Sequence, residues 1–267
     1  MNPIDKYNQR AKKINSLLCV GLDPDFEKLP EKFKSLTHLQ FEFNKYIIEQ
    51  THEYAAAFKP NMASYEVRGK EGWEDLQMTM DYLKKNHPDI FTICDAKRGD
   101  IGYTSELYAK AILDNLDFDA ITLHPYLGQD AIQPFLDRKD KVSIILCKTS
   151  NPGAGEFQDL IVDTECPLWM RVAENVSKNW NKNNNCILVV GATYPEELCE
   201  IRKIVGDLTI LVPGFGVQGG NIKDVMNVGK NSEGMGLILS CSKAIIFSDN
   251  PKREVRKLCE EIRKYIG

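Results

Sequence analysis

The chain has 267 residues, of which 43% are hydrophobic and 27% charged, and its formal net charge is −4 at pH 7. This balance is typical of a folded globular protein and offers no broad basic surface to nucleic acid or to an anionic membrane. No apolar stretch approaches the roughly 20 residues of a membrane span, and the polar N-terminal segment lacks the apolar region of a signal peptide. We therefore expect a cytoplasmic protein.

Short apolar segments alternate with helical patterns along the whole chain. The segments typical of buried strands are Leu17–Asp23, Ala56–Asn61, Ile90–Lys97, Ala120–Pro125, Val142–Ser150, Cys186–Thr193, Thr209–Gly214 and Leu237–Ser242. Amphipathic spacing predicts helices over Leu39–Tyr54, Trp73–Asn86, Thr104–Asn115, Leu168–Asn179, Pro195–Ile204 and Lys252–Ile266. Strands that are apolar on both faces and alternate with helices indicate a parallel sheet covered by helices. The eight repeats predict an α/β fold with a single domain over residues 1–267, a (β/α)8, or TIM, barrel.

The eight cysteines are expected to be reduced rather than disulfide-bonded. No CxxC pair occurs, so zinc ribbons and thioredoxin-type redox sites lack their usual signature. Five cysteines lie within or beside the apolar segments and are predicted to be buried thiols: Cys19, Cys94, Cys147, Cys186 and Cys241.

The predicted strands end in charged and polar residues, which a barrel gathers at one mouth. Asp95 and Lys97 are two residues apart and would share one face of the third strand, while Asp100 lies just beyond. Lys59 ends the second strand, and Asp23 ends the first. Because buried charges are costly unless they are paired, these groups would shift one another's pKa values. A reactive constellation is favoured over a salt-bridge network that only closes the barrel end.

A glycine-rich segment, Pro213–Asn221, follows the seventh predicted strand, and Ser242 and Lys243 follow the eighth. Barrels commonly bind phosphate with these two loops. Glycine lets the backbone approach a ligand closely, and a helix N-terminus offers free N–H groups to an anion. We therefore favour a phosphate site here over a plain turn.

The segment Thr149–Phe157, after the fifth strand, has small residues around Pro152 and predicts a loop that can close over a ligand, with Ser150 able to read a polar ring edge. An ordinary surface connection is the alternative.

His124, one of four histidines, ends the fourth strand and is expected to support or pack rather than to catalyse. No motif typical of metal ligands occurs.

Four segments, in order along the chain, resemble blocks of the orotidine 5′-phosphate decarboxylase family in its longer bacterial-type branch. They are Phe58–Asn61, Asp95–Thr104, Asn151–Ala154 and Val212–Gly220. The resemblance runs from Cys19 to about Phe247. It implies conversion of orotidine 5′-phosphate to UMP and carbon dioxide, the last step of new pyrimidine synthesis, in a homodimer that needs neither metal nor organic cofactor.

The resemblance also implies residue roles. Lys97 would stabilise the charge that develops at C6 of the pyrimidine and supply its proton, within an alternating network of Lys59, Asp95, Lys97 and Asp100. Three residues would reach the partner subunit's site across the interface: Asp100, Ile101 and Thr104.

The implied substrate-binding residues lie at the ends of five strands. Asp23 and Lys59 would hold ribose hydroxyls, and Ser150 would read the pyrimidine edge. The phosphate end would be bound by Pro213, Gln218, Gly219, Gly220, Ser242 and Lys243.

Two positions depart from the family pattern: Lys243 stands where an arginine is usual, and His124 where an asparagine is common. The alternative enzyme is a magnesium-dependent sugar-phosphate decarboxylase or synthase of the same barrel superfamily. Those enzymes carry an acidic metal ligand where Lys59 stands, and a lysine there would repel magnesium. A nucleotide-binding protein without activity is the third hypothesis, and the intact charged set argues against it.

Overall fold

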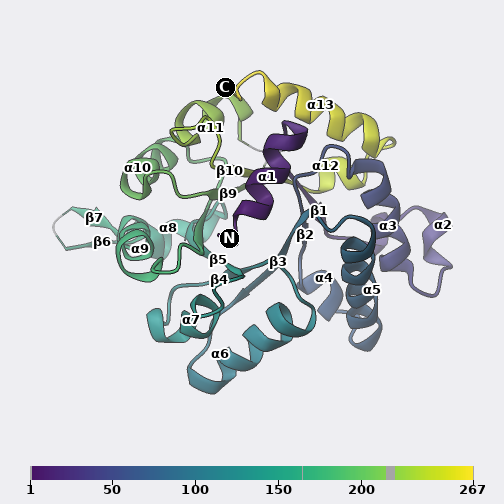
Figure 1. Cartoon of the computed structure of the whole chain (residues 1–267), viewed down its shortest axis with the longest axis horizontal. Coiled ribbons are helices and arrows are strands. Elements are labelled where there is room, and N and C mark those ends of the chain that lie inside the picture. The colour runs from purple at the N-terminus through teal and green to yellow at the C-terminus, as the bar shows by residue number, and fades with distance from the viewer. Residues whose placement is uncertain (1, 164, 215–219, 267) are drawn as a thin grey trace.

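The computed structural model describes residues 2–163, 165–214 and 220–266, which form a closed parallel barrel wrapped by helices (Figure 1). Around the barrel the strands follow the order β1-β10-β9-β8-β5-β4-β3-β2. Their bounds are β1 Leu18–Leu22, β2 Ala57–Pro60, β3 Phe91–Arg98, β4 Ala120–Leu123, β5 Val142–Lys148, β8 Cys186–Val190, β9 Ile210–Pro213 and β10 Leu237–Cys241. All eight predicted strands are present, and the predicted (β/α)8 TIM barrel is confirmed.

The helices lie outside the barrel and cover its strands (Figure 1). The longer ones are α1 Asp5–Ile14, α3 Leu39–Thr51, α5 Lys70–Asn86, α6 Gly102–Ala109, α7 Gln129–Leu136, α9 Leu168–Asn175, α10 Pro195–Val205, α11 Ile222–Gly229 and α13 Pro251–Arg263. Short helices are η1 Phe26–Lys28, α2 Glu31–Lys34, α4 Ala63–Glu66, η3 Pro152–Ala154, α8 Gly155–Gln158 and α12 Lys243–Ile246. Every residue of β1, β2, β4, β8 and β10 is buried, because one face of each strand meets the helices and the other the barrel interior.

The structure corrects two predicted helices. The helix predicted over Thr104–Asn115 is α6 followed by a π-helical turn, η2 (Lys110–Asn115), and the helix predicted over Leu168–Asn179 is α9 followed by another, η4 (Val176–Trp180). The apolar spacing of a sequence does not reveal where a helix widens by one residue per turn.

Helix α7 and a short strand pair are among the elements that were not predicted. Helix α7 contains Pro134, a residue that normally argues against a helix interior. The antiparallel pair of β6 (Ile161–Val162) and β7 (Cys166–Pro167) has strands too short for an alternating pattern to register.

Helix α1 covers the end of the barrel where the strands begin (Figure 1). The Tyr7 hydroxyl lies 3.1 Å from the carbonyl oxygen of Leu17 and 2.6 Å from that of Leu237, both at strand starts. The opposite end, where the strands finish, is therefore the end at which a site can form.

The thiols agree with the sequence. All eight cysteines are free, and the five predicted to be buried are buried. Burial raises the pKa of the Cys147 thiol to about 12, so this thiol stays protonated at neutral pH. Within the described ranges, no helix combines the length and the apolar character needed to cross a membrane.

Candidate active site

Three of the predicted charges meet at the ends of β2 and β3. The Lys59 ammonium, only 6% exposed, donates to Asp95 Oδ2 over 3.0 Å, and Lys97 Nζ donates to Asp95 Oδ1 over 2.5 Å. Lys97 is half exposed, so its ammonium is accessible from the mouth of the barrel while it remains tied to the carboxylate. The structure thus brings Lys59, Asp95 and Lys97 together as the sequence predicted.

The backbone conformation that brings Asp95 and Lys97 together differs from the predicted one. We expected Asp95 and Lys97 to share a face of a regular strand, but the register between β3 and β4 shifts between Cys94 and Arg98. Within this bulge Lys97 has φ +50°, a left-handed conformation that costs free energy for a residue with a Cβ. Such outliers concentrate at functional sites, where the surrounding contacts hold them in place.

The cluster stays charged because its members compensate one another. Burial alone would lower the pKa of Lys59, but the carboxylates of Asp95 and Asp23 outweigh it and hold that pKa above its ordinary value. Burial alone would raise the pKa of Asp95, but Lys59 and Lys97 outweigh it and hold that pKa well below its usual range. Lys59 and Asp95 are therefore ionised at neutral pH, as a preorganised electrostatic site requires.

Asp23 faces the same mouth from the end of β1. One carboxylate oxygen accepts from the Asn61 backbone N–H over 2.9 Å, which ties the ends of β1 and β2 together. A Cβ added at Gly21 would lie 2.5 Å from the Cβ of Ser242 and 2.9 Å from the second carboxylate oxygen of Asp23. Only glycine fits at position 21, and its absent side chain lets Asp23 and Ser242 approach one another.

Within one chain, none of Asp100, Ile101 and Thr104 forms a described hydrogen bond or ion pair with the side chains of Lys59, Asp95 and Lys97. The Asp100 carboxylate accepts from the Ile101 backbone N–H over 2.7 Å, and it forms no ion pair with any described residue. Ile101 is 65% exposed, and Thr104, on α6, is exposed as well. A single chain therefore assembles three of the four predicted charges and leaves the half-buried Asp100 without an ion pair to any described residue.

The predicted phosphate end is described in part. Gln218 and Gly219 lie outside the described residues. Gly220 donates its N–H to Gly214 O over 3.0 Å, and a Cβ there would come within 2.0 Å of Ala192 O, so the chain requires glycine. Pro213 ends β9, and its carbonyl accepts from the Ala192 N–H over 3.0 Å.

The last two predicted phosphate residues follow β10. Lys243 is exposed at the start of α12, and Ser242 immediately precedes it. The Ser242 hydroxyl is buried and has no hydrogen-bond partner among the residues that the structure describes. A buried hydroxyl without a partner is uncommon and is accounted for when a ligand supplies the missing bond.

The loop after β5 packs around Lys148, a residue for which no role was predicted. Lys148, at the end of β5, is 1% exposed, forms an ion pair with Asp159 and lies 4.7 Å from the centre of the Tyr194 ring. Ser150 is exposed at this end of the barrel, with its Cβ against Gly191. The sequence does show that Lys148 is a lysine at the end of an apolar strand. Its partner Asp159 lies in the following loop, and sequence spacing alone could not identify this pair.

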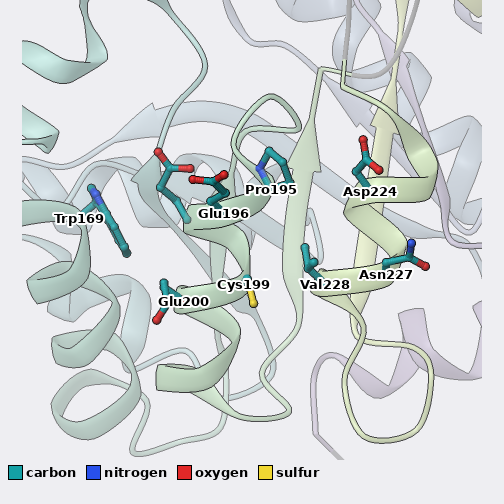
Figure 2. Close-up of a pocket in the computed structure, with 9 residues that line it drawn as sticks. Trp169, Pro195, Glu196, Cys199, Glu200, Asp224, Asn227 and Val228 are labelled. Carbon is teal, nitrogen blue, oxygen red and sulfur yellow. The ribbon is translucent and has the colours of Figure 1, made fainter.

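A cleft of about 790 Å³ lies elsewhere, on the outer surface between α9, α10 and α11 (Figure 2). Its wall carries Glu196, Glu197, Glu200 and Asp224 and none of the predicted site residues. A wall so rich in carboxylates repels an anionic ligand, so we assign the site to the mouth of the barrel and not to this cleft.

Comparisons with known proteins cover nearly the whole chain. A profile of the orotidine 5′-phosphate decarboxylase / HUMPS family matches residues 16–258. The curated orotidine 5′-phosphate decarboxylase of Cellvibrio japonicus is 45% identical over 94% of this chain and 91% of its own, and that of Flavobacterium johnsoniae is 46% identical over 97% and 94%. The solved OMP decarboxylase of Leishmania donovani matches with a TM-score of 0.89 and 39% identity over 99% of this chain and 98% of its own. These likenesses span the strands and loops that form the charged mouth.

Proposed function

The chain belongs to the orotidine 5′-phosphate decarboxylase / HUMPS family, and from this premise we propose that it decarboxylates orotidine 5′-phosphate to UMP in pyrimidine biosynthesis. It is an enzyme, a carboxy-lyase. The observation that carries the proposal is the largely buried Asp95 carboxylate held between the ammonium groups of Lys59 and Lys97. Such a cluster suits a reaction in which a negative charge appears on carbon.

Lys97 is the proton donor. The bond between C6 and the carboxylate carbon breaks, the electron pair stays on C6 and carbon dioxide leaves. The Lys97 ammonium stabilises this charge and transfers a proton from Nζ to C6, after which the amine regains a proton from water. Because Asp95 orients the ammonium before substrate arrives, little reorganisation is needed during the reaction. The chemistry calls for no metal and no organic cofactor.

Asp95 acts on the substrate through its charge. Lys59 and Lys97 keep it ionised, and it faces the substrate carboxylate with like charge. This repulsion raises the free energy of the bound substrate and is relieved as carbon dioxide leaves. It therefore lowers the barrier from the bound substrate to the transition state. Lys59, fixed on the other side of Asp95, also reaches the ribose hydroxyls together with Asp23.

The remaining residues bind the distant parts of the nucleotide. Ser150 reads the pyrimidine edge. The phosphate is bound by Pro213, Gln218, Gly219, Gly220, Ser242 and Lys243. The Ser242 hydroxyl, which has no hydrogen-bond partner among the described residues, and the exposed Lys243 ammonium support this assignment. Binding energy gained at the phosphate can offset the electrostatic stress at the reacting carbon.

We further propose a homodimer in which Asp100, Ile101 and Thr104 of each subunit complete the site of its partner. Apolar side chains cluster beside Asp100 without cover: Ile101 is 65% exposed and Tyr103 75%. Exposed apolar groups of this size in one short segment are typical of a protein interface. The lack of an ion pair between Asp100 and any described residue of its own chain supports the same arrangement.

Turnover of orotidine 5′-phosphate by EDTA-treated wild-type protein tests the proposed function. We expect loss of the substrate's ultraviolet absorbance at the same rate with and without EDTA. Turnover of a sugar phosphate that requires added magnesium would instead favour the alternative enzyme, which the Lys59 ammonium at the end of β2 disfavours. Tight binding of UMP without turnover would favour the nucleotide-binding protein.

Lys243→Arg is expected to raise kcat/KM for orotidine 5′-phosphate by about 3- to 10-fold, because a guanidinium binds phosphate with two parallel hydrogen bonds where an ammonium acts as a point charge. Lys243→Ala should lower the same parameter. Steady-state kinetics on the three proteins gives the comparison. An unchanged or lower kcat/KM in Lys243→Arg would count against the assignment of Lys243 to the phosphate.

A further inference from the structure

The catalytic segment of β3 faces a single residue of β4. The two strands pair Cys94 with Ile121 and then Arg98 with Leu123. Three residues of β3, from Asp95 to Lys97, therefore lie opposite one residue of β4, which is Thr122. Regular ladder hydrogen bonds cannot serve three residues with one partner, so the bulge needs another source of hydrogen bonds.

The side chain of Thr122 supplies one of them, to the Lys97 N–H, while the Met62 N–H donates to Asp95 O over 3.1 Å and the Arg98 guanidinium donates to Ala96 O over 2.9 Å. The Thr122 hydroxyl accepts from the Lys97 backbone N–H over 2.9 Å and donates to Asp95 Oδ1 over 3.0 Å. Thr122 is 1% exposed, so water does not compete for these bonds. The single proton and one lone pair of the hydroxyl are both used, and they join the main chain of one catalytic residue to the side chain of the other.

These two hydrogen bonds stabilise the unfavourable backbone conformation of Lys97 and the orientation of the Asp95 carboxylate. Lys97 has the left-handed φ of +50°, and the bond to its N–H stabilises that conformation. The Asp95 carboxylate accepts from Thr122 and Lys97 on one oxygen and from Lys59 on the other, which defines its plane. Beyond the bulge, β4 holds β3 by its main chain, where the His124 N–H donates to Arg98 O over 3.0 Å.

We propose that Thr122 is a positioning residue for the decarboxylation: its hydroxyl fixes the orientation of the Asp95 carboxylate and the backbone from which the Lys97 side chain extends. This inference rests on the proposed function and deepens it. Thr122 does not touch the substrate itself. Its loss should leave nucleotide binding almost unchanged and slow the chemical step, because a small misplacement of a reacting group is costly.

Two pairs of proteins isolate the hydroxyl. Wild type and Thr122→Val differ by a hydroxyl replaced with a methyl group of similar shape, while Thr122→Ser and Thr122→Ala differ by the hydroxyl alone. We expect kcat for orotidine 5′-phosphate to fall by about 10- to 100-fold from wild type to Thr122→Val and from Thr122→Ser to Thr122→Ala. KM, and the Kd for UMP from calorimetry, should change by less than about 3-fold within each pair. Thr122→Ser should retain most of the wild-type kcat.

If Thr122→Val does not fold, the comparison of Thr122→Ser with Thr122→Ala still tests the role of the hydroxyl. A melting temperature above the assay temperature shows that a variant is folded. Equal kcat values within a folded pair would overturn the inference, as would a loss in Thr122→Ser as large as that in Thr122→Ala, since packing of the methyl group would then explain both. Wild type without turnover would overturn the proposed function and this inference with it. Wild-type turnover with an unaffected Thr122→Val would overturn this inference alone.

Discussion

Replacing Lys97 with alanine is expected to lower kcat for orotidine 5′-phosphate by about four orders of magnitude or more. The variant loses both the ammonium that stabilises the developing charge on C6 and the proton that C6 receives, and each contribution is worth about 10²-fold or more. Stopped-flow or steady-state assays that follow substrate absorbance measure the fall in kcat. Nucleotide binding should survive, because the ribose and phosphate contacts come from other strands.

Two effects besides catalysis could lower the activity of Lys97→Ala: loss of folding and loss of one positive charge. Lys97 is half exposed, and in its absence Asp95 keeps its ion pair with the buried Lys59, so Lys97→Ala should fold. Lys85→Ala removes an exposed lysine near the end of α5 and should retain wild-type kcat. Turnover by folded Lys97→Ala within about 10-fold of wild type would exclude Lys97 as the proton donor.

Mixing inactive Lys97→Ala with inactive Asp100→Ala is expected to restore about one quarter of the wild-type activity. In a two-fold symmetric dimer, random exchange makes about half of the molecules hybrids. Each hybrid has one site with both substitutions and one intact site, in which Lys97 of one chain meets Asp100 of its partner. Activity measured against the mixing ratio, with hybrids counted by mass spectrometry of differently tagged chains, gives the result.

The same mixture can contradict the shared site. Each variant incubated with its own tagged copy controls for activation by exchange alone. If hybrids form in the expected share and no activity returns, Asp100 acts in the site of its own chain or outside the site. The Asp100 carboxylate, which forms no ion pair with a described residue of its own chain, and the exposed Ile101 and Tyr103 beside it favour recovery.

Much of the architecture was predictable because it depends on local pattern. Strands that are apolar on both faces can be buried only between helices and a barrel interior, and all eight are where the sequence predicted them. The association of Lys59, Asp95 and Lys97 was predictable for a related reason. Each residue lies at the end of an apolar strand, and a parallel barrel brings such ends to one mouth.

The errors have a different origin. Helix α7 forms although Pro134 lies within it, and the π-helical turns after α6 and α9 leave no periodic trace. Lys148 could be seen at the end of a strand, but its ion pair with Asp159 depends on how the following loop folds back.

The sequence by itself determined the barrel, the mouth and the charged residues that meet there, because burial and strand direction follow from hydrophobic pattern along the chain. Only the tertiary structure decided how those charges are aimed. The left-handed backbone at Lys97 and the orientation of Asp95 both depend on Thr122, a residue 25 positions beyond Lys97 on the neighbouring strand. A bulge exists only relative to the strand that pairs with it, so its consequences cannot be read from the segment that carries it.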